Sequence, residues 1–183
     1  MAGNEVKPFK FNEEQYDITK PIYAGILESL GVKDANTALE EIASNPIEGK
    51  EDGMMFNRYV ASLFKDEKGE VSDSLRRDAA KKALENLPPE TSPYIKGYLA
   101  EMSGDYIPFD TVLTAGIMVG EGKSLQMGCG EGKTGVLSLA TYGKLSQSPK
   151  NQVFLTSSTP ILAEEALDKT SFYDTLQLSL IHI

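Results

Sequence analysis

The feature that most constrains this chain is a glycine-rich run at residues 128–134, which ends in Gly-Lys-Thr. Gly130 and Gly132 let backbone N–H groups approach a phosphate closely. The residues that follow are compatible with a helix, whose N-terminus carries a partial positive charge. Lys133 supplies a cation for outer phosphates, and Thr134 supplies a hydroxyl for Mg²⁺. The run therefore predicts a phosphate-binding loop.

The pattern around this loop predicts an α/β fold. The strict P-loop pattern has glycine where this chain has Met127, so the match is to the G-x-G-K-T variant of helicase-like motors. A short strand is predicted over 124–127, and a helix over 133–145 leaves the loop. A second strand over 152–156 and a helix over 159–167 follow. This order is typical of the opening of a parallel sheet.

The first 104 residues have a helical pattern instead. Apolar residues at 22, 26, 27 and 30 share one helix face, and Gly31 follows as a stop signal. Thr37 and Glu40 fit a capping box, and Ser72 or Ser74 can cap a later helix. Helices are predicted over about 12–30, 37–44, 54–64, 72–87, 92–102 and, after residue 104, in the apolar window 108–119.

Two of these helices have a predicted buried face. In the helix over 54–64 the inward residues are Tyr59, Val60, Leu63 and Phe64. In the helix that ends at residue 87 the apolar stripe is Leu75, Ala79, Ala83 and Leu84.

Composition limits the function classes. The formal net charge is −9, which argues against nucleic acid as the main partner. A single cysteine allows no internal disulfide, and no window approaches the about 20 apolar residues of a membrane span. The chain is therefore expected to be soluble and cytoplasmic.

The last six residues, 178–183, have the sequence LSLIHI, which looks like translated sequencing adapter. The hypothesis is that the natural coding sequence was cut near Gln177. Because His182 lies in this tail, it is left out of every site argument.

A colinear series of motifs makes the prediction more specific. It resembles the first nucleotide-binding domain of SecA, the preprotein-translocase motor ATPase, over about residues 105–177. The series comprises Phe109-Asp110, Gly116, Glu121-Gly122-Lys123, Met127, residues 130–134, 154–158, 162–166 and 172–176. The implied organisation is a helical region over 1–104 and a partial RecA-like P-loop NTPase domain over 105–177.

The resemblance implies ATP and Mg²⁺ as cofactors. Lys133 would bind the outer phosphates, and Thr134 would coordinate the metal. The backbone amides of Gly130, Glu131 and Gly132 would wrap the β-phosphate. The side chain of Glu131 is expected to face solvent, since a carboxylate that points inward would repel the phosphates.

Three further residues belong to the predicted nucleotide site. Phe109 and Asp110 either flank the adenine or pack at a helix start. Cys129, where the family commonly has threonine, either fills the loop or presents a reactive thiol. Val112 stands where the family has a glutamine that contacts adenine, so base selectivity is left open.

The predicted function is that of an ATP-binding N-terminal fragment of a SecA-like motor, which would couple ATP hydrolysis to protein translocation. Its partners would be an unfolded polypeptide and, where the motor acts peripherally at a membrane, a translocation channel. After Thr134 no second acidic motif follows, and no arginine occurs after Arg77, so hydrolysis by this chain alone is not expected. The alternatives are a nucleic-acid helicase of the same superfamily and a non-catalytic helical interaction protein with a degenerate nucleotide loop.

Overall fold

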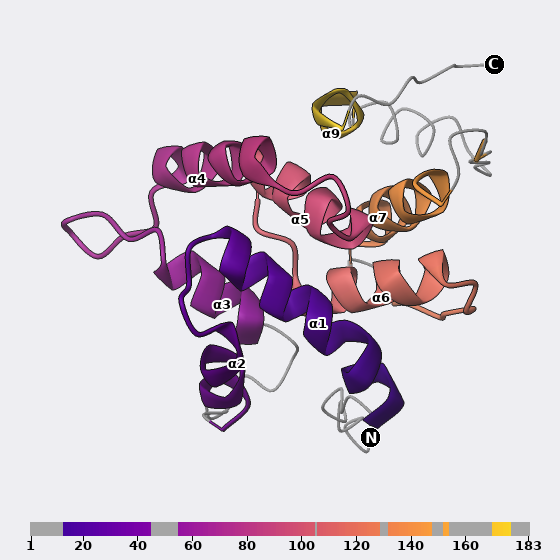
Figure 1. The fold of residues 1–183 in the computed structure, drawn as a ribbon, viewed down its shortest axis with the longest axis horizontal. Coiled ribbons are helices and arrows are strands. Elements are labelled where there is room, and N and C mark those ends of the chain that lie inside the picture. The colour runs from indigo at the N-terminus through magenta and orange to yellow at the C-terminus, as the bar shows by residue number, and fades with distance from the viewer. Residues whose placement is uncertain are drawn as a thin grey trace, which may run out of the picture.

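The protein is described by a computed structural model over residues 13–44, 55–104, 106–128, 132–147, 152–153 and 170–176. These residues form eight helices and no β-strand, and Figure 1 shows the helices packed directly on one another. The helices are α1 (Glu13–Ser29), α2 (Ala35–Ser44), α3 (Met55–Ser62), α4 (Asp73–Asn86), α5 (Pro93–Ser103), α6 (Asp110–Gly120), α7 (Lys133–Leu145) and α9 (Thr170–Thr175).

The predicted α/β fold, with the parallel sheet of a RecA-like domain, is therefore wrong for the described part of the chain. Residues 124–127 have no regular secondary structure and pair with no described strand, and they are largely exposed. A segment without a pairing partner leaves its backbone N–H and C=O groups to water, so it does not make a strand. Of the second predicted strand only Gln152 and Val153 are described, and they are not in a strand. The helix predicted over 159–167 lies outside the described residues.

The N-terminal helices were predicted well, apart from one cap. Helix α1 ends before Gly31, which has a φ of 89° that suits a glycine stop. Helix α2 begins at Ala35, and the Oδ1 atom of Asp34 accepts a hydrogen bond from the backbone N–H of Thr37 at 3.0 Å. The predicted capping box at Thr37 was therefore placed too late, because Asp34 already occupies the N-cap position.

Two helix faces differ from the prediction. In α3, Val60 and the following Phe64 are buried, but Leu63 is exposed. In α4, Leu75 is 49% exposed whereas Arg76 is 1% exposed. The buried stripe of α4 is thus shifted by one residue at Arg76 and Ala80, whereas Ala83 is buried as predicted.

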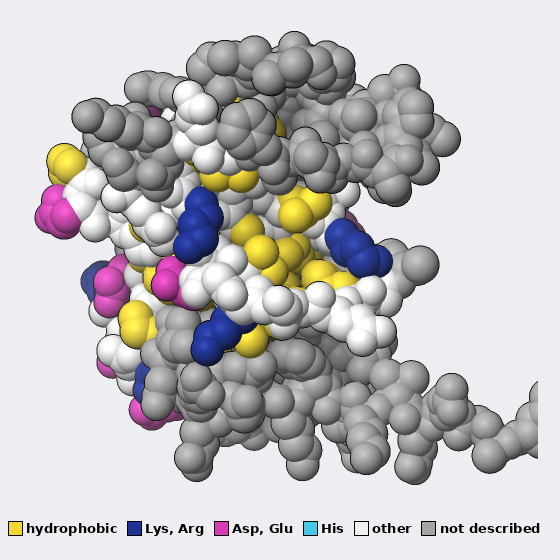
Figure 2. Space-filling model, turned by 90° about the vertical axis from the view of Figure 1, so that its right-hand side faces the viewer, with side chains coloured by type: hydrophobic (Ala, Val, Ile, Leu, Met, Phe, Trp, Pro, Cys, Tyr) yellow, Lys and Arg dark blue, Asp and Glu magenta, His cyan; other side chains and the backbone are white. Residues whose placement is uncertain are grey.

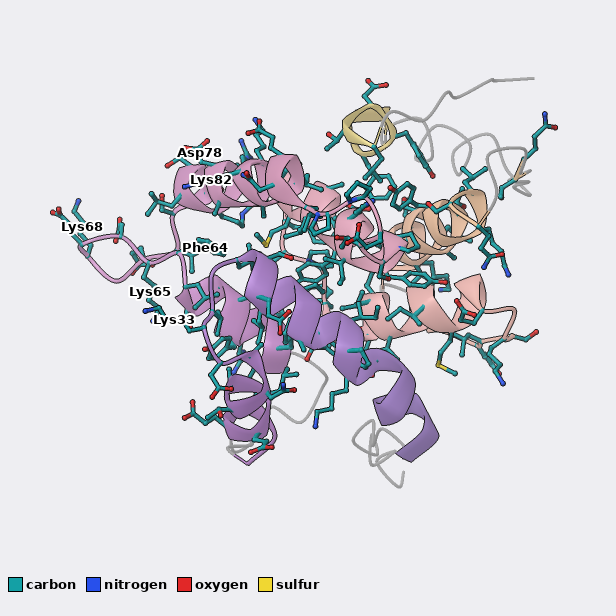
Figure 3. The ribbon with its side chains drawn as sticks, viewed as in Figure 1. Lys33, Phe64, Lys65, Lys68, Asp78 and Lys82 are labelled. Carbon is teal, nitrogen blue, oxygen red and sulfur yellow. The ribbon has the colours of Figure 1, made fainter. Side chains whose placement is uncertain are left out.

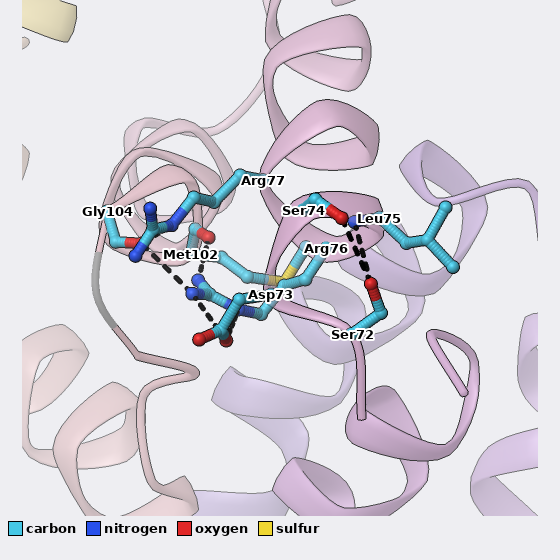
Figure 4. A network of polar contacts seen from close by, with 8 residues as sticks. All are labelled: Ser72, Asp73, Ser74, Leu75, Arg76, Arg77, Met102 and Gly104. Atoms are coloured by element: carbon cyan, nitrogen blue, oxygen red, sulfur yellow. Dashed lines mark hydrogen bonds and ion pairs between the residues drawn. The ribbon is translucent and has the colours of Figure 1, made fainter. Parts of the chain in front are cut away.

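The shift in α4 is explained by the end of α5 (Figure 4). The guanidinium of Arg76 donates to the carbonyl oxygens of Met102 and, at 3.0 Å, of Gly104. Arg77 also donates to the Gly104 carbonyl, at 2.9 Å. Cations are favourable at a helix C-terminus, where carbonyl groups lack intrahelical partners. Ser72 caps α4 by accepting a hydrogen bond from the Leu75 N–H at 3.4 Å, which selects it over Ser74.

Helices α6 and α7 pack side by side in the same direction. Their contacts are close because glycines face the neighbouring helix. A Cβ atom built on Gly116 of α6 would lie 2.7 Å from the Cβ atom of Leu139 of α7. At the C-terminal end of both helices, Gly120 and Gly143 enclose the ring of Tyr94 from α5. This parallel arrangement places the two helix N-termini at the same end.

One hydrophobic core runs through most of the described helices. It includes Ile26 and Leu27 of α1, Leu99 of α5, Leu113 of α6 and Leu139 of α7. The core therefore continues across residue 104, where the sequence predicts a division between two domains. That division stays a prediction.

Replacing Gly116 by alanine is expected to destabilise the protein by about 1–3 kcal/mol, the usual cost of overpacking. The added methyl group would meet the Cβ atom of Leu139, which cannot rotate away, so the two helices must separate. Gly25→Ala is the matched control, since its new Cβ atom would meet the end of the flexible Ile95 side chain, with Cδ1 at 2.4 Å and Cγ1 at 3.4 Å. Urea unfolding measures both variants. Equal losses would contradict the close packing of α6 on α7.

Candidate phosphate-binding site

The predicted phosphate loop leads directly into α7, as the sequence indicates. Gly132 is the N-cap residue, with φ 77° and ψ 32°, a left-handed conformation that favours glycine. It provides no side-chain cap, and the first intrahelical hydrogen bond runs from the Val136 N–H to the Gly132 carbonyl at 3.2 Å. The N–H groups of the first turn therefore lack intrahelical partners, as at any helix N-terminus, and they can bind an anion.

Lys133 is the first residue of α7 and its side chain is exposed. Its Nζ atom donates a hydrogen bond to the carbonyl oxygen of Gly128, at the start of the loop. The ammonium group thus lies across the loop, where it would meet phosphate oxygens. Thr134, the predicted Mg²⁺ ligand, is half-buried in the same turn. Cys129, Gly130 and Glu131 lie outside the described residues.

The close packing of Val112 against the start of α7 also favours glycine at position 132. A Cβ atom built on it would lie 2.7 Å from the Cγ2 atom of Val112, and one built on Gly135 would lie 3.0 Å from the Cγ1 atom. Val112 is fully buried in the first turn of α6. The residue at the position linked by resemblance to base recognition is therefore packed beneath the loop.

Phe109 and Asp110 lie at the N-terminus of α6 but differ in their surroundings. Phe109 is exposed. The carboxylate of Asp110, which is 6% exposed, accepts hydrogen bonds from the backbone N–H groups of Phe56 at 3.0 Å and Asn57 at 2.9 Å. Asp110 therefore caps α3 with both oxygens. Its predicted place beside adenine stays a prediction.

Three helix N-termini meet in this region. Helix α3 begins at the carboxylate of Asp110, helix α6 begins with Asp110 itself, and Val112 joins α6 to the start of α7. Each N-terminus carries roughly half a positive elementary charge. The carboxyl groups of Asp110 and of Glu101 on α5 offset part of this, and Lys133 adds a full positive charge. The helix N-termini and Lys133 are the groups that can attract an anion here.

The prediction of Mg²⁺ at Thr134 stays a prediction. Within the described ranges, no three His, Cys, Asp or Glu side chains could hold a metal ion together. Mg²⁺ usually keeps several waters and takes substrate phosphates as ligands, so a single protein hydroxyl such as that of Thr134 is compatible with it.

The molecular face on the α6 and α7 side combines apolar and basic character. Figure 2 shows hydrophobic side chains gathered between Lys and Arg side chains on this face. The exposed large apolar residues include Phe109, Leu125 and Leu137. None of the described helices is long and apolar enough to cross a membrane.

Two residues near the loop were missed from the sequence. Glu101, on α5, and Tyr106, which precedes α6, lie beneath the first turns of α7. The sequence signal that could have found them is Gly135. Glycine is unfavourable inside a helix, so its presence there indicates a close contact with another segment.

Comparisons of the chain with models of protein families, with curated proteins and with solved structures found no match. The resemblance to SecA therefore rests on the motif series alone.

Proposed function

We propose that the chain binds the phosphates of ATP, with Mg²⁺, at the loop that precedes α7. The observation that carries this proposal is the left-handed Gly132 at the N-cap of α7, followed by Lys133 whose amine reaches back across the loop to Gly128. A tight glycine turn, a helix N-terminus and a positioned ammonium group are the parts that a bound phosphate requires.

The wider assignment is an N-terminal fragment of a SecA-like motor that moves an unfolded polypeptide, in some settings through a membrane channel. The order and spacing of the motifs from Phe109 to Thr134 support it. ATP binding without useful hydrolysis is expected of this chain, because the second acidic motif that positions water and metal is missing from its sequence.

Lys133→Ala is expected to weaken ATP binding about 10- to 100-fold, since hydrogen bonds to charged groups contribute roughly 1.5–3 kcal/mol. Lys144→Ala is the matched control, because it removes the same charge from the last turn of the same helix. It is expected to change the affinity less than twofold. Isothermal titration of ATP in the presence of Mg²⁺ measures both variants.

Two outcomes would contradict the proposal. Equal effects of the two substitutions would indicate a general charge effect and not a site. No ATP binding by the unmodified chain would favour the helical interaction protein. In the complete gene product, an ATPase stimulated by RNA or DNA and not by unfolded polypeptide would favour the helicase.

A further inference from the structure

A buried carboxylate and a tyrosine hydroxyl lie beneath the first turns of α7. Glu101, on α5, is 4% exposed, and the hydroxyl of Tyr106 donates a hydrogen bond to it. A buried carboxylate needs such a donor, because the loss of water around its charge is costly. Burial, and then the negative charge of Glu101, raise the pKa of Tyr106, so the phenol stays protonated and acts as the donor.

The Tyr106 hydroxyl is in contact with the backbone of α7. A Cβ atom built on Gly135 would lie 2.7 Å from the Tyr106 Oη atom. Gly135 directly follows Lys133 and Thr134, the two residues assigned to phosphate and metal. The first turn of α7 therefore rests on an oxygen atom that Glu101 holds in place.

The hydroxyl of Ser138 connects the same turn to a further helix. The buried hydroxyl of Ser138 donates to the carbonyl oxygen of Thr134 at 3.0 Å and also hydrogen-bonds Tyr173 of α9. Tyr173 is itself close enough to Glu101 to interact with its charge. The polar groups under α7 thus form one cluster, contributed by α5, α7, α9 and the segment before α6.

We propose that Glu101 and Tyr106 are positioning residues for the phosphate-binding turn of α7. The inference rests on the proposed function, because it assigns these residues a role in phosphate binding through the backbone that they support. They act through Gly135 and do not touch the nucleotide. Backbone N–H donors bind well only when they are held close to the productive geometry, and such supporting contacts hold them there.

The far end of the same helix pair provides a matched control. There the Tyr94 hydroxyl donates to the Glu121 carboxylate at 3.0 Å. Its ring also lies against glycine backbone, because a Cβ atom built on Gly143 would be 2.8 Å from the Tyr94 Oη atom. The two tyrosines therefore make the same kinds of contact with glutamate and glycine, but only Tyr106 lies at the N-terminus of α7.

The test compares Tyr106→Phe with Tyr94→Phe in the full chain. Tyr106→Phe is expected to lower the melting temperature more than Tyr94→Phe, because the buried carboxylate of Glu101 loses a donor, whereas water can replace the donor at the exposed Glu121. Only Tyr106→Phe is expected to weaken ATP binding, by about fivefold or more, as measured by titration with Mg²⁺ present. It is also expected to change the rate at which a thiol reagent labels Cys129 by more than twofold, with no nucleotide added. Cys129 is the sole cysteine and directly follows Gly128, whose carbonyl binds Lys133.

Variants of Glu101 separate positioning from a loss of fold. Glu101→Ala removes the acceptor and is expected to reproduce the effects of Tyr106→Phe. Glu101→Gln keeps an oxygen that can accept from Tyr106, so it is expected to recover most of the ATP affinity and the original Cys129 labelling rate. If Tyr106→Phe does not fold, these two variants decide whether Glu101 and Tyr106 position the first turn of α7.

Equal changes of ATP affinity and of the Cys129 labelling rate in the two tyrosine variants, or no change of either quantity, would overturn the proposal. So would a Glu101→Gln variant that behaves like Glu101→Ala. If the unmodified chain does not bind ATP, the phosphate-binding function fails, and the Cys129 labelling rate alone decides whether Tyr106 positions the loop.

Discussion

Asp110→Ala is expected to destabilise the protein by about 3 kcal/mol, through the loss of the two hydrogen bonds that cap α3. The backbone N–H groups of Phe56, which is buried, and of Asn57, which is half-buried, would lose their acceptor. For a chain of this length, a loss of about 3 kcal/mol lowers the melting temperature by roughly 6–12 °C. Thermal unfolding followed by circular dichroism measures the change.

Asp66 provides a control with matching chemistry in a different environment. Its Oδ1 atom accepts hydrogen bonds from the N–H groups of Lys68 at 2.8 Å and Glu70 at 3.0 Å. The turn between α3 and α4 that contains these residues is exposed and projects from the molecule. Lys65 and Lys68 are labelled there in Figure 3. Water can replace the lost acceptor there, so Asp66→Ala is expected to cost less than about 1 kcal/mol. A similar loss in both variants would mean that burial of Asp110 is not what makes its cap important.

The cap at Asp110 also relates the helical N-terminal region to the candidate site. Asp110 belongs to the motif series that resembles SecA, yet its carboxylate binds a helix from the first 104 residues. Loss of this cap would weaken the link between α3 and the N-terminus of α6, which would then depend on the hydrogen bonds from the Asn57 Nδ2 atom to the carbonyl oxygens of Ile107 and Pro108. Because Val112 joins α6 to Gly132, such a change would also reach the phosphate-binding turn.

Much of the helical structure could be predicted because its signals are local. Gly31 stops α1, Ser72 caps α4, and Ser92 with Pro93 begins α5. These signals depend on the backbone conformation of a few neighbouring residues, which a sequence displays directly. The start of α7 after Gly132 belongs to the same class, and for that reason the beginning of this helix could be predicted.

The errors come from contacts between distant segments. Periodicity in α4 favours Leu75 as a buried residue, but the carbonyl groups at the end of α5 draw in Arg76 instead. The residues under the loop were missed for the same reason, since Glu101, Tyr106 and Gly135 come together only in the folded chain. The strand prediction failed for a related reason, because a strand needs a partner that the pattern of residues 124–127 cannot supply.

Alkaline unfolding is expected to begin just above pH 10. Burial raises the pKa of six tyrosines above the usual value of 10.0, and the nearby Asp110 carboxylate adds to this for the most buried pair, Tyr23 and Tyr98. The six are Tyr23, Tyr94, Tyr98, Tyr106, Tyr142 and Tyr173.

Between pH 10 and these raised values, the unfolded chain releases phenol protons that the folded chain keeps. Stability is therefore complete below pH 10 and falls as the pH rises, by about 1.4 kcal/mol per pH unit for each tyrosine. Tyr23 and Tyr98, the two most buried, would together lower it by about 3 kcal/mol per pH unit, a large part of the stability of an ordinary domain. The other four tyrosines are less buried and add smaller contributions, because solvent screens them. Tyrosinate absorbance and circular dichroism are expected to change together, in one steep transition. Ionisation of all tyrosines near pH 10 with the helices intact would contradict this account.

Tyr98→Phe tests the same argument at one residue. Tyr98 is 0% exposed, and its hydroxyl has no hydrogen-bond partner among the described residues. Phenylalanine keeps the packing and removes a buried hydroxyl that costs about 1–3 kcal/mol when unpaired, so the variant is expected to be more stable at pH 7. It is also expected to unfold at a higher pH. The free energy of unfolding would fall less steeply with pH, by the contribution of one proton, because one group no longer ionises in the unfolded chain. Urea unfolding at pH 7 and at pH 10.5 measures both effects. A variant less stable than the unmodified protein at both pH values would show that the Tyr98 hydroxyl stabilises the fold, which would remove this residue from the alkaline mechanism.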